Sequence, residues 1–208
     1  EHRMSNFDLL IRNGTVATAA DTFQADVAIK DGRVVALGHD LGTAEQEIDA
    51  AGKLLLPGGI EGHCHIEQIS SSRVMTADDF YSGTVSAVFG GTTTVIPFAA
   101  QQKGDSLRQT VEDYHACAGP KAVIDYGFHL IISDPSDQVI GQELPALIKD
   151  GYTSFKVYMT YDDLRLDDYQ MLEVLSAARR DGAMVMVHAE NHDMIRWLSE
   201  KLLDAGHW

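Results

Sequence analysis

The sequence predicts an α/β protein in which a parallel sheet, with helices between its strands, follows a small module made only of strands. After the Pro-Gly-Gly at 57–59, short apolar segments alternate with stretches of helical periodicity, which is the pattern of successive βαβ units. Before that point, strand-like segments are separated by Asn-Gly and Asp-Gly pairs, which favour tight turns. The later segments fit either an open doubly wound sheet or the first part of a (β/α)8 barrel, which needs about 250 residues.

The first part of the chain is expected to be a small β-domain that spans residues 1–56, followed by a second domain over 57–208. A hairpin is predicted across Asp31-Gly32, because Asp-Gly supplies the positive φ angles of a tight turn. The first strand is expected to stop at Asn13-Gly14, and Gly52 should interrupt the last one. The predicted strands are 7–11, 26–29, 33–37 and 48–56.

The second part is predicted to alternate buried strands with amphipathic helices. Residues 76–79, Thr-Ala-Asp-Asp, would cap the first helix and supply its acidic first turn. Leu172, Leu175 and Ala178 are expected to face inward from the fourth helix. The predicted strands are 59–66, 92–98, 126–132, 154–159 and 184–188, and the predicted helices are 76–90, 106–119, 136–151, 168–182 and 192–208.

Composition excludes several classes of partner. A formal net charge of −15 disfavours binding to nucleic acid or to anionic membranes. No run of apolar residues approaches the roughly 18 needed to span a bilayer, and no secretion signal is expected at the N-terminus. Two cysteines, Cys64 and Cys117, do not make a disulfide framework, so a cytoplasmic location is expected.

Ionisable residues fall near the carboxyl ends of three predicted strands. His63 and His65 share one face of a strand and could bind one divalent metal, although an isolated His-x-His is equally compatible with packed histidines. Lys156 lies inside an apolar strand, which is costly unless its charge is removed, paired or carried to solvent. His188 ends the last strand. In α/β barrels the active site is built at this end of the strands, so together they indicate a metal-dependent site.

These segments together resemble the dihydropyrimidinase/D-hydantoinase branch of the amidohydrolase superfamily. The matching motifs are PGGIEGHCH at 57–65, GGTTT at 90–94, FKVYM at 155–159 and VHAEN at 187–191, and the similarity extends over nearly the whole chain from Phe7. The resemblance implies a (β/α)8 barrel, of which about five strands are present here, preceded by the N-terminal part of a β-sandwich domain.

The resemblance also implies a site and a reaction. His63 and His65 would bind one of two divalent metals, expected to be zinc, and His188 the other, while Lys156, carboxylated by CO2, would bridge them. Tyr161 would donate a hydrogen bond to the oxyanion during ring opening of a dihydropyrimidine or a 5-substituted hydantoin, in pyrimidine degradation. The loop 67–78 would rim the substrate pocket and contact the ring substituent through Ile69, Val74 and Met75. The family also suggests self-association as a dimer or homotetramer.

Other interpretations remain open at this stage. The family's remaining metal-binding histidine and its general-base aspartate would lie beyond residue 208, so a fragment that is inactive by itself is expected. An allantoinase or dihydroorotase would need a more basic rim, whereas the rim loop contains only Arg73. A non-catalytic, scaffold-like homologue would have lost the metal ligands, which are retained here. His129 is interpreted as a packed strand residue, His115 as a surface residue and Glu190 as a possible partner of a ligating histidine, while Cys64 is given no catalytic role.

Overall fold

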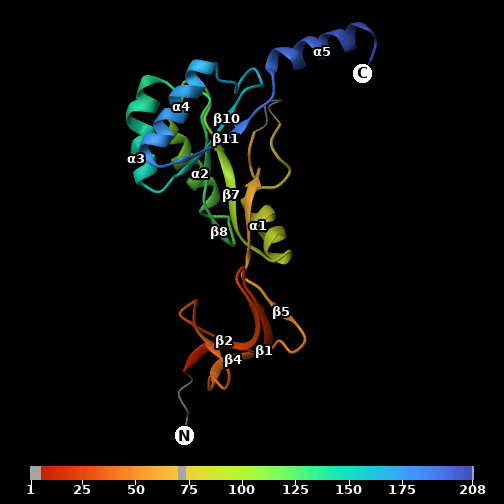
Figure 1. The fold of residues 1–208 in the computed structure, drawn as a ribbon, viewed down its shortest axis with the longest axis vertical. Coiled ribbons are helices and arrows are strands. Elements are labelled where there is room, and N and C mark those ends of the chain that lie inside the picture. The colour runs from red at the N-terminus through yellow and green to blue at the C-terminus, as the bar shows by residue number, and fades with distance from the viewer. Residues whose placement is uncertain (1–5, 70–73, 208) are drawn as a thin grey trace. The chain divides into compact units, whose positions relative to one another are not determined.

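The computed structural model describes residues 6–69 and 74–207 and divides into two compact units, Glu1–Gly58 and Gly59–Trp208 (Figure 1). The first unit is a five-stranded sheet in the order β3-β2-β1-β4, with β5 also paired to β1. Its small core is formed by Val16, Ala25 and Val27. The strands are β1 Phe7–Ala17, β2 Thr22–Lys30, β3 Arg33–Gly38, β4 Ala44–Asp49 and β5 Leu54–Leu55.

Turn chemistry in this unit is partly as predicted. The β2–β3 hairpin is confirmed, with φ angles of 51° at Asp31 and 70° at Gly32. The expected strand end at Asn13-Gly14 is wrong, because β1 continues and absorbs Asn13, at φ 60°, in a register shift between Ile11 and Gly14. The backbone N–H of Asn13 donates a hydrogen bond to the Asp26 carboxylate at 3.0 Å, and this contact stabilises the bulge. The last predicted strand is divided into β4 and β5.

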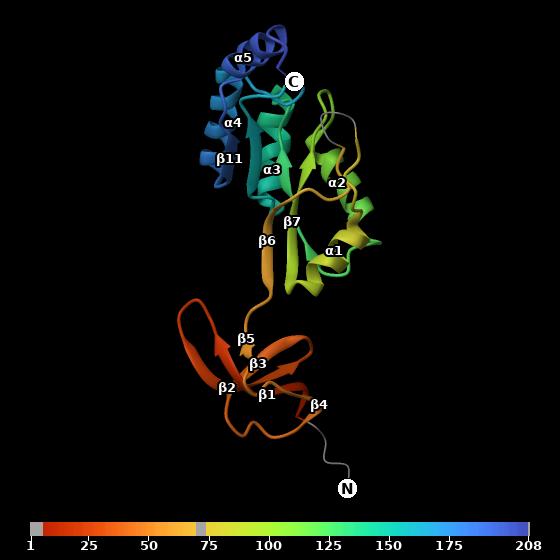
Figure 2. The ribbon, with the colours of Figure 1, turned by 90° about the vertical axis from the view of Figure 1, so that its right-hand side faces the viewer.

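The second unit contains a parallel sheet in the order β11-β10-β9-β7-β6, with β8 also paired to β7. The sheet is curled, and the helices between its strands pack against its outer face, as in part of a barrel (Figure 2). This confirms the predicted α/β class and partial barrel. The strands are β6 Gly59–Cys64, β7 Thr92–Ala100, β8 Asp125–Tyr126, β9 His129–Ile131, β10 Ser154–Tyr158 and β11 Met184–His188. The helices are α1 Phe80–Phe89, α2 Leu107–Ala118, the π-helical turn η1 Val139–Glu143, α3 Leu144–Lys149, α4 Asp168–Asp181 and α5 His192–Asp204.

Alternation along the strands separates two apolar clusters. In β10, Phe155 and Val157 join the large core beneath the helices, while Tyr158 joins a smaller cluster on the other face. That smaller cluster is built on Phe98 of β7, Ile131 of β9 and Tyr158, all buried. We call it the inner cluster, and it underlies the candidate site.

Several helix predictions need correction. Helix α1 begins at Phe80 and not at Thr76, because Asp79 is the N-cap and forms a capping box with Ser82. In α4 the prediction that Ala178 faces inward is confirmed, whereas Leu172 and Leu175 are exposed and Val174 and Ala177 complete the buried face. The segment predicted as a strand over 126–132 is divided into β8 and β9.

Helix α5 has no buried residue and exposes Met194, Trp197 and Leu198 on one side. Within the residues that the structure describes, no helix is long and apolar enough to cross a membrane.

Candidate functional site

His63, in β6, and His65, directly after the end of that strand, lie on the inner cluster. The ring centroid of His63 is 4.9 Å from that of Phe98, and the centroid of His65 is 5.0 Å from it. The two imidazoles are 5.7 Å apart and edge to face. Cys64 points the other way and packs against the large core beneath the helices. Strand alternation therefore places two metal-capable nitrogen ligands on one surface.

The thiol of Cys64, which lies between the two histidines, has low reactivity. Burial, together with the nearby Glu61 carboxylate, raises the pKa of Cys64 to about 11. The thiol is therefore protonated at neutral pH, and a protonated thiol is a poor nucleophile.

His129 ties β6 to β10 beneath this pair. It is buried, its Nδ1 lies 2.6 Å from the Ser154 hydroxyl, and its Nε2 lies 3.0 Å from the Gly62 carbonyl. Its ring is 5.1 Å from Phe98, and burial lowers its pKa. His129 is thus the packed strand histidine that the sequence suggested, and it fixes the backbone next to His63.

Lys156 projects from β10 on the same face as Tyr158. The residue is only 8% exposed, and its Nζ lies 5.2 Å from the centre of the Tyr158 ring. Burial lowers the lysine's pKa, and no carboxylate in the described part of the chain forms an ion pair with it. Burial of an ammonium that has no carboxylate partner is unfavourable, so this position destabilises the charged form of the lysine relative to an exposed one.

His188 and Tyr161 contact each other, and both also contact Tyr158. The His188 ring stacks on Tyr158 at 5.6 Å and lies 5.2 Å from the Tyr161 ring. Nε2 of His188 forms a short hydrogen bond with the Glu190 carboxylate, the contact suggested for Glu190. Tyr161 is half-exposed and has a φ of 71°, a left-handed conformation that is costly for a tyrosine and that recurs at functional sites.

The predicted residues therefore form two groups. His63 and His65 gather at Phe98, whereas Lys156, Tyr161 and His188 gather at Tyr158. Phe98 and Tyr158 both belong to the inner cluster, so the two groups lie on the same apolar surface, which we call the floor of the site. Among residues 6–69 and 74–207, no three His, Cys, Asp or Glu side chains converge as a complete metal site. Three imidazoles and a buried lysine nevertheless fit as a partial ligand set for divalent metal, because imidazole is a common zinc ligand and a neutral amine can be converted to an oxygen ligand.

The described residues of the predicted rim loop, 67–69 and 74–78, include one antiparallel bridge. Ile69 and Met75 form an antiparallel bridge, and both side chains and that of Val74 are exposed. Arg73 lies outside the described residues. The described part of the loop therefore exposes three large apolar side chains.

Sequence reasoning missed one polar residue at the carboxyl end of a strand and misjudged the burial of one histidine on α2. Gln101, fully buried after β7, accepts from the backbone N–H groups of Ser133 and Asp134 at 3.1 Å and donates to the Asp105 carbonyl at 2.8 Å. It clamps the loops that follow β7 and β9. A glutamine directly after an apolar strand was the available signal. His115, predicted at the surface, is instead half-buried, with its Nε2 2.6 Å from the Tyr152 hydroxyl.

Comparison with known proteins matches this geometry. Residues 54–207 match the model of the amidohydrolase family. D-hydantoinase from Geobacillus stearothermophilus is 48% identical over 201 residues, which cover 95% of this chain and 42% of that protein. Dihydropyrimidinase from Rattus norvegicus is 42% identical over 206 residues, with 95% and 39% coverage. A solved D-hydantoinase structure, 45% identical, superposes with a TM-score of 0.92 over 96% of this chain and 44% of that chain. The chain thus spans less than half the length of these relatives.

Proposed function

Because this chain belongs to the amidohydrolase family, whose members are generally metal-dependent, we propose that it forms the N-terminal part of a hydrolase that opens a cyclic amide ring. The substrate class is a dihydropyrimidine or a 5-substituted hydantoin, as the names of its relatives suggest. The observation that carries the proposal is the arrangement of His63, His65, Lys156 and His188 on one floor at the carboxyl ends of β6, β10 and β11.

Each of these residues has a role toward two divalent metals, for which we propose zinc. His63 and His65 would hold one metal, and His188 the other. The amine of Lys156 would attack CO2 and lose a proton, and the resulting carbamate would make Lys156 a ligand shared by both metals. Its burial without a carboxylate partner supports this conversion, since the carbamate replaces a disfavoured cation with a ligand. Such metals, when bound, supply an acidified water and polarise a carbonyl.

Tyr161 would stabilise the charge that develops in the reaction. When the ring amide carbon becomes tetrahedral, its oxygen gains negative charge, and the Tyr161 hydroxyl would donate a hydrogen bond to it. Its position beside His188 places this donor next to a proposed ligand. Ile69, Val74 and Met75 would contact the substituent carried on the ring.

The exposed apolar rim favours neutral rings over the anionic substrates of a dihydroorotase or the more polar ring of allantoin. Retention of the four proposed ligands disfavours a scaffold-like homologue. Both cysteines are free, which supports the proposed cytoplasmic setting. A dimer or homotetramer is the proposed assembly, and a small cyclic ureide is the proposed partner.

The buried lysine gives the direct test. We expect the purified chain to take up zinc and to show a carbamate signal by NMR when supplied with isotopically labelled CO2. Lys156→Met should abolish the carbamate signal and lower zinc uptake, whereas Lys149→Met, at an exposed lysine in the same unit, should change neither. In any longer form that carries these residues, zinc-dependent opening of dihydrouracil or hydantoin should be lost in Lys156→Met. A carbamate signal that persists in Lys156→Met, or wild-type zinc uptake no greater than that of the variant, would contradict the assignment.

A further inference from the structure

We propose that Gln68 is a positioning residue for His65, holding the imidazole in the tautomer that leaves Nε2 free to bind metal; the metal role of His65 rests on the proposed function. Nδ1 of His65 lies 2.5 Å from Oε1 of Gln68. An amide oxygen only accepts hydrogen bonds, so Nδ1 carries the proton and donates it. The lone pair is then on Nε2, the atom left for a ligand.

Gln68 is itself immobilised. The residue is buried at 9% exposure, and its backbone N–H donates to the Thr76 hydroxyl at 3.1 Å. The Thr76 N–H donates in return to the Gln68 carbonyl at 3.0 Å. The backbone that carries the Gln68 side chain is therefore held by Thr76, across the rim loop.

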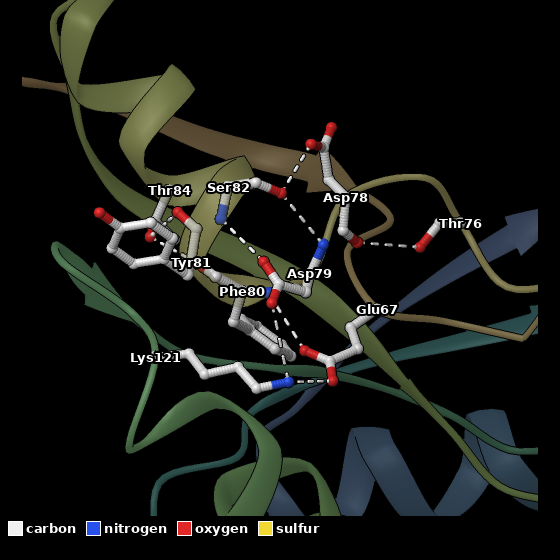
Figure 3. Close-up of polar contacts among 9 residues, drawn as sticks. All are labelled: Glu67, Thr76, Asp78, Asp79, Phe80, Tyr81, Ser82, Thr84 and Lys121. Carbon is white, nitrogen blue, oxygen red and sulfur yellow. Dashed lines mark hydrogen bonds and ion pairs between the residues drawn. The ribbon is translucent and has the colours of Figure 1, made fainter.

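An ion pair anchors the base of this loop (Figure 3). Glu67, at a φ of 49°, accepts a hydrogen bond from the first backbone N–H of α1, that of Phe80, at 3.1 Å. Its other carboxylate oxygen pairs with the Lys121 ammonium, which also lies 3.9 Å from the Asp79 carboxylate. The Glu67 N–H closes the loop by donating to the Asp78 carbonyl at 3.0 Å.

These hydrogen bonds and ion pairs connect residues outside the site to His65, the proposed metal ligand. Lys121, in the segment after α2, and the N-terminus of α1 hold Glu67; the next residue, Gln68, holds His65. Without Gln68 the His65 ring could populate either tautomer and rotate. Metal binding would then have to select one tautomer and one ring orientation. Loss of such a partner typically weakens metal affinity about 10–100-fold.

The experiment measures the tautomer and zinc affinity separately. Long-range nitrogen–proton NMR of the metal-free chain should show the His65 ring protonated at Nδ1. Gln68→Leu should shift His65 toward the other tautomer and weaken zinc binding about 10-fold or more. Gln68→Glu retains an acceptor and should keep both properties. Gln102→Leu, at an exposed glutamine of the same unit, is the matched control and should change neither.

The anchor is tested by Lys121→Met, which should weaken zinc binding in the same direction but less, with Lys149→Met as its control. If His65 in the wild-type chain is protonated at Nε2, or if Gln68→Leu leaves the tautomer and the affinity unchanged, the proposal is wrong. Gln68→Met, close in shape to glutamine, gives the same test if the leucine variant does not fold. If no variant binds zinc, the proposed function fails while the tautomer measurement still decides the role of Gln68.

Discussion

Replacing Phe98 by alanine is expected to lower the free energy of unfolding of the barrel unit by about 3–5 kcal/mol. Phe98 is 1% exposed and lies at the centre of the inner cluster with Ile131 and Tyr158. Its ring also supports His63 and His65 at centroid distances of 4.9 and 5.0 Å. The substitution thus removes buried apolar surface and leaves a cavity directly beneath the histidine pair.

Phe89→Ala is the matched control, because Phe89 is 89% exposed at the end of α1 and should cost less than about 0.5 kcal/mol. Unfolding in urea, followed by circular dichroism, measures both variants. Phe98→Leu should lie between them, since it retains part of the buried volume. A Phe98→Ala variant as stable as Phe89→Ala would show that the inner cluster does not support the sheet.

Replacing Glu143 by alanine is expected to cost about 3 kcal/mol, because its carboxylate caps α2 from a distant part of the chain. Glu143 is buried, and one oxygen accepts from the Leu107 N–H at 2.6 Å, the Arg108 N–H at 3.2 Å and the Ser106 hydroxyl at 3.1 Å. The other oxygen accepts from the Gln138 amide at 2.8 Å. Without the carboxylate, two backbone donors at a helix N-terminus lose their partner.

The same contacts set a pH dependence. Burial by itself raises the pKa of Glu143, but the hydrogen bonds from Arg108, Gln138, Ser106 and Leu107 outweigh it, and the pKa is lowered overall. A lowered pKa means that the carboxylate's stabilising effect is present above the unfolded-state pKa of about 4.3 and is lost as pH falls through the folded-state value. The stability difference between the wild type and Glu143→Ala should therefore shrink in acid.

Hydrogen exchange of the α2 amides measures this effect locally, and the exposed Glu112→Ala on the same helix is the control. Exchange in residues 107–111 should accelerate in Glu143→Ala and remain unchanged in Glu112→Ala. Equal protection in both variants at neutral pH would rule out Glu143 as the cap.

Local patterns predicted much of this molecule. The Asp31-Gly32 hairpin followed from turn chemistry, and the shared face of His63 and His65 followed from strand alternation. The order of strands and helices fixed the α/β class. In each case, residues close in the sequence decide the conformation, so the pattern is visible without tertiary structure.

The features that could not be predicted from the sequence depend on contacts between segments that are far apart in the chain. Asn13 can occupy either a turn or a bulge, and only pairing with β2 and the Asp26 carboxylate selects the bulge. Glu143 lies far along the chain from the helix that it caps, and His115 meets Tyr152 only after α2 has packed. Which predicted ligands share a neighbour likewise depends on how the sheet curls around Phe98 and Tyr158.

At the π-helical turn Val139–Glu143, the insertion or removal of one residue would change how the flanking side chains are oriented. A π turn holds one residue more than an α-helix would place there, and successive residues of an α-helix are about 100° apart around its axis. Removing a single residue, such as Gly141, would rotate Glu143 and the adjoining α3 together by about 100° relative to Val139. The π turn therefore sets the rotation between its start, where Val139 is buried, and its end, where Glu143 contacts α2 and Leu144 is buried. An insertion or deletion in this turn would therefore disturb both the hydrogen bonds between Glu143 and α2 and the packing of α3 on the core.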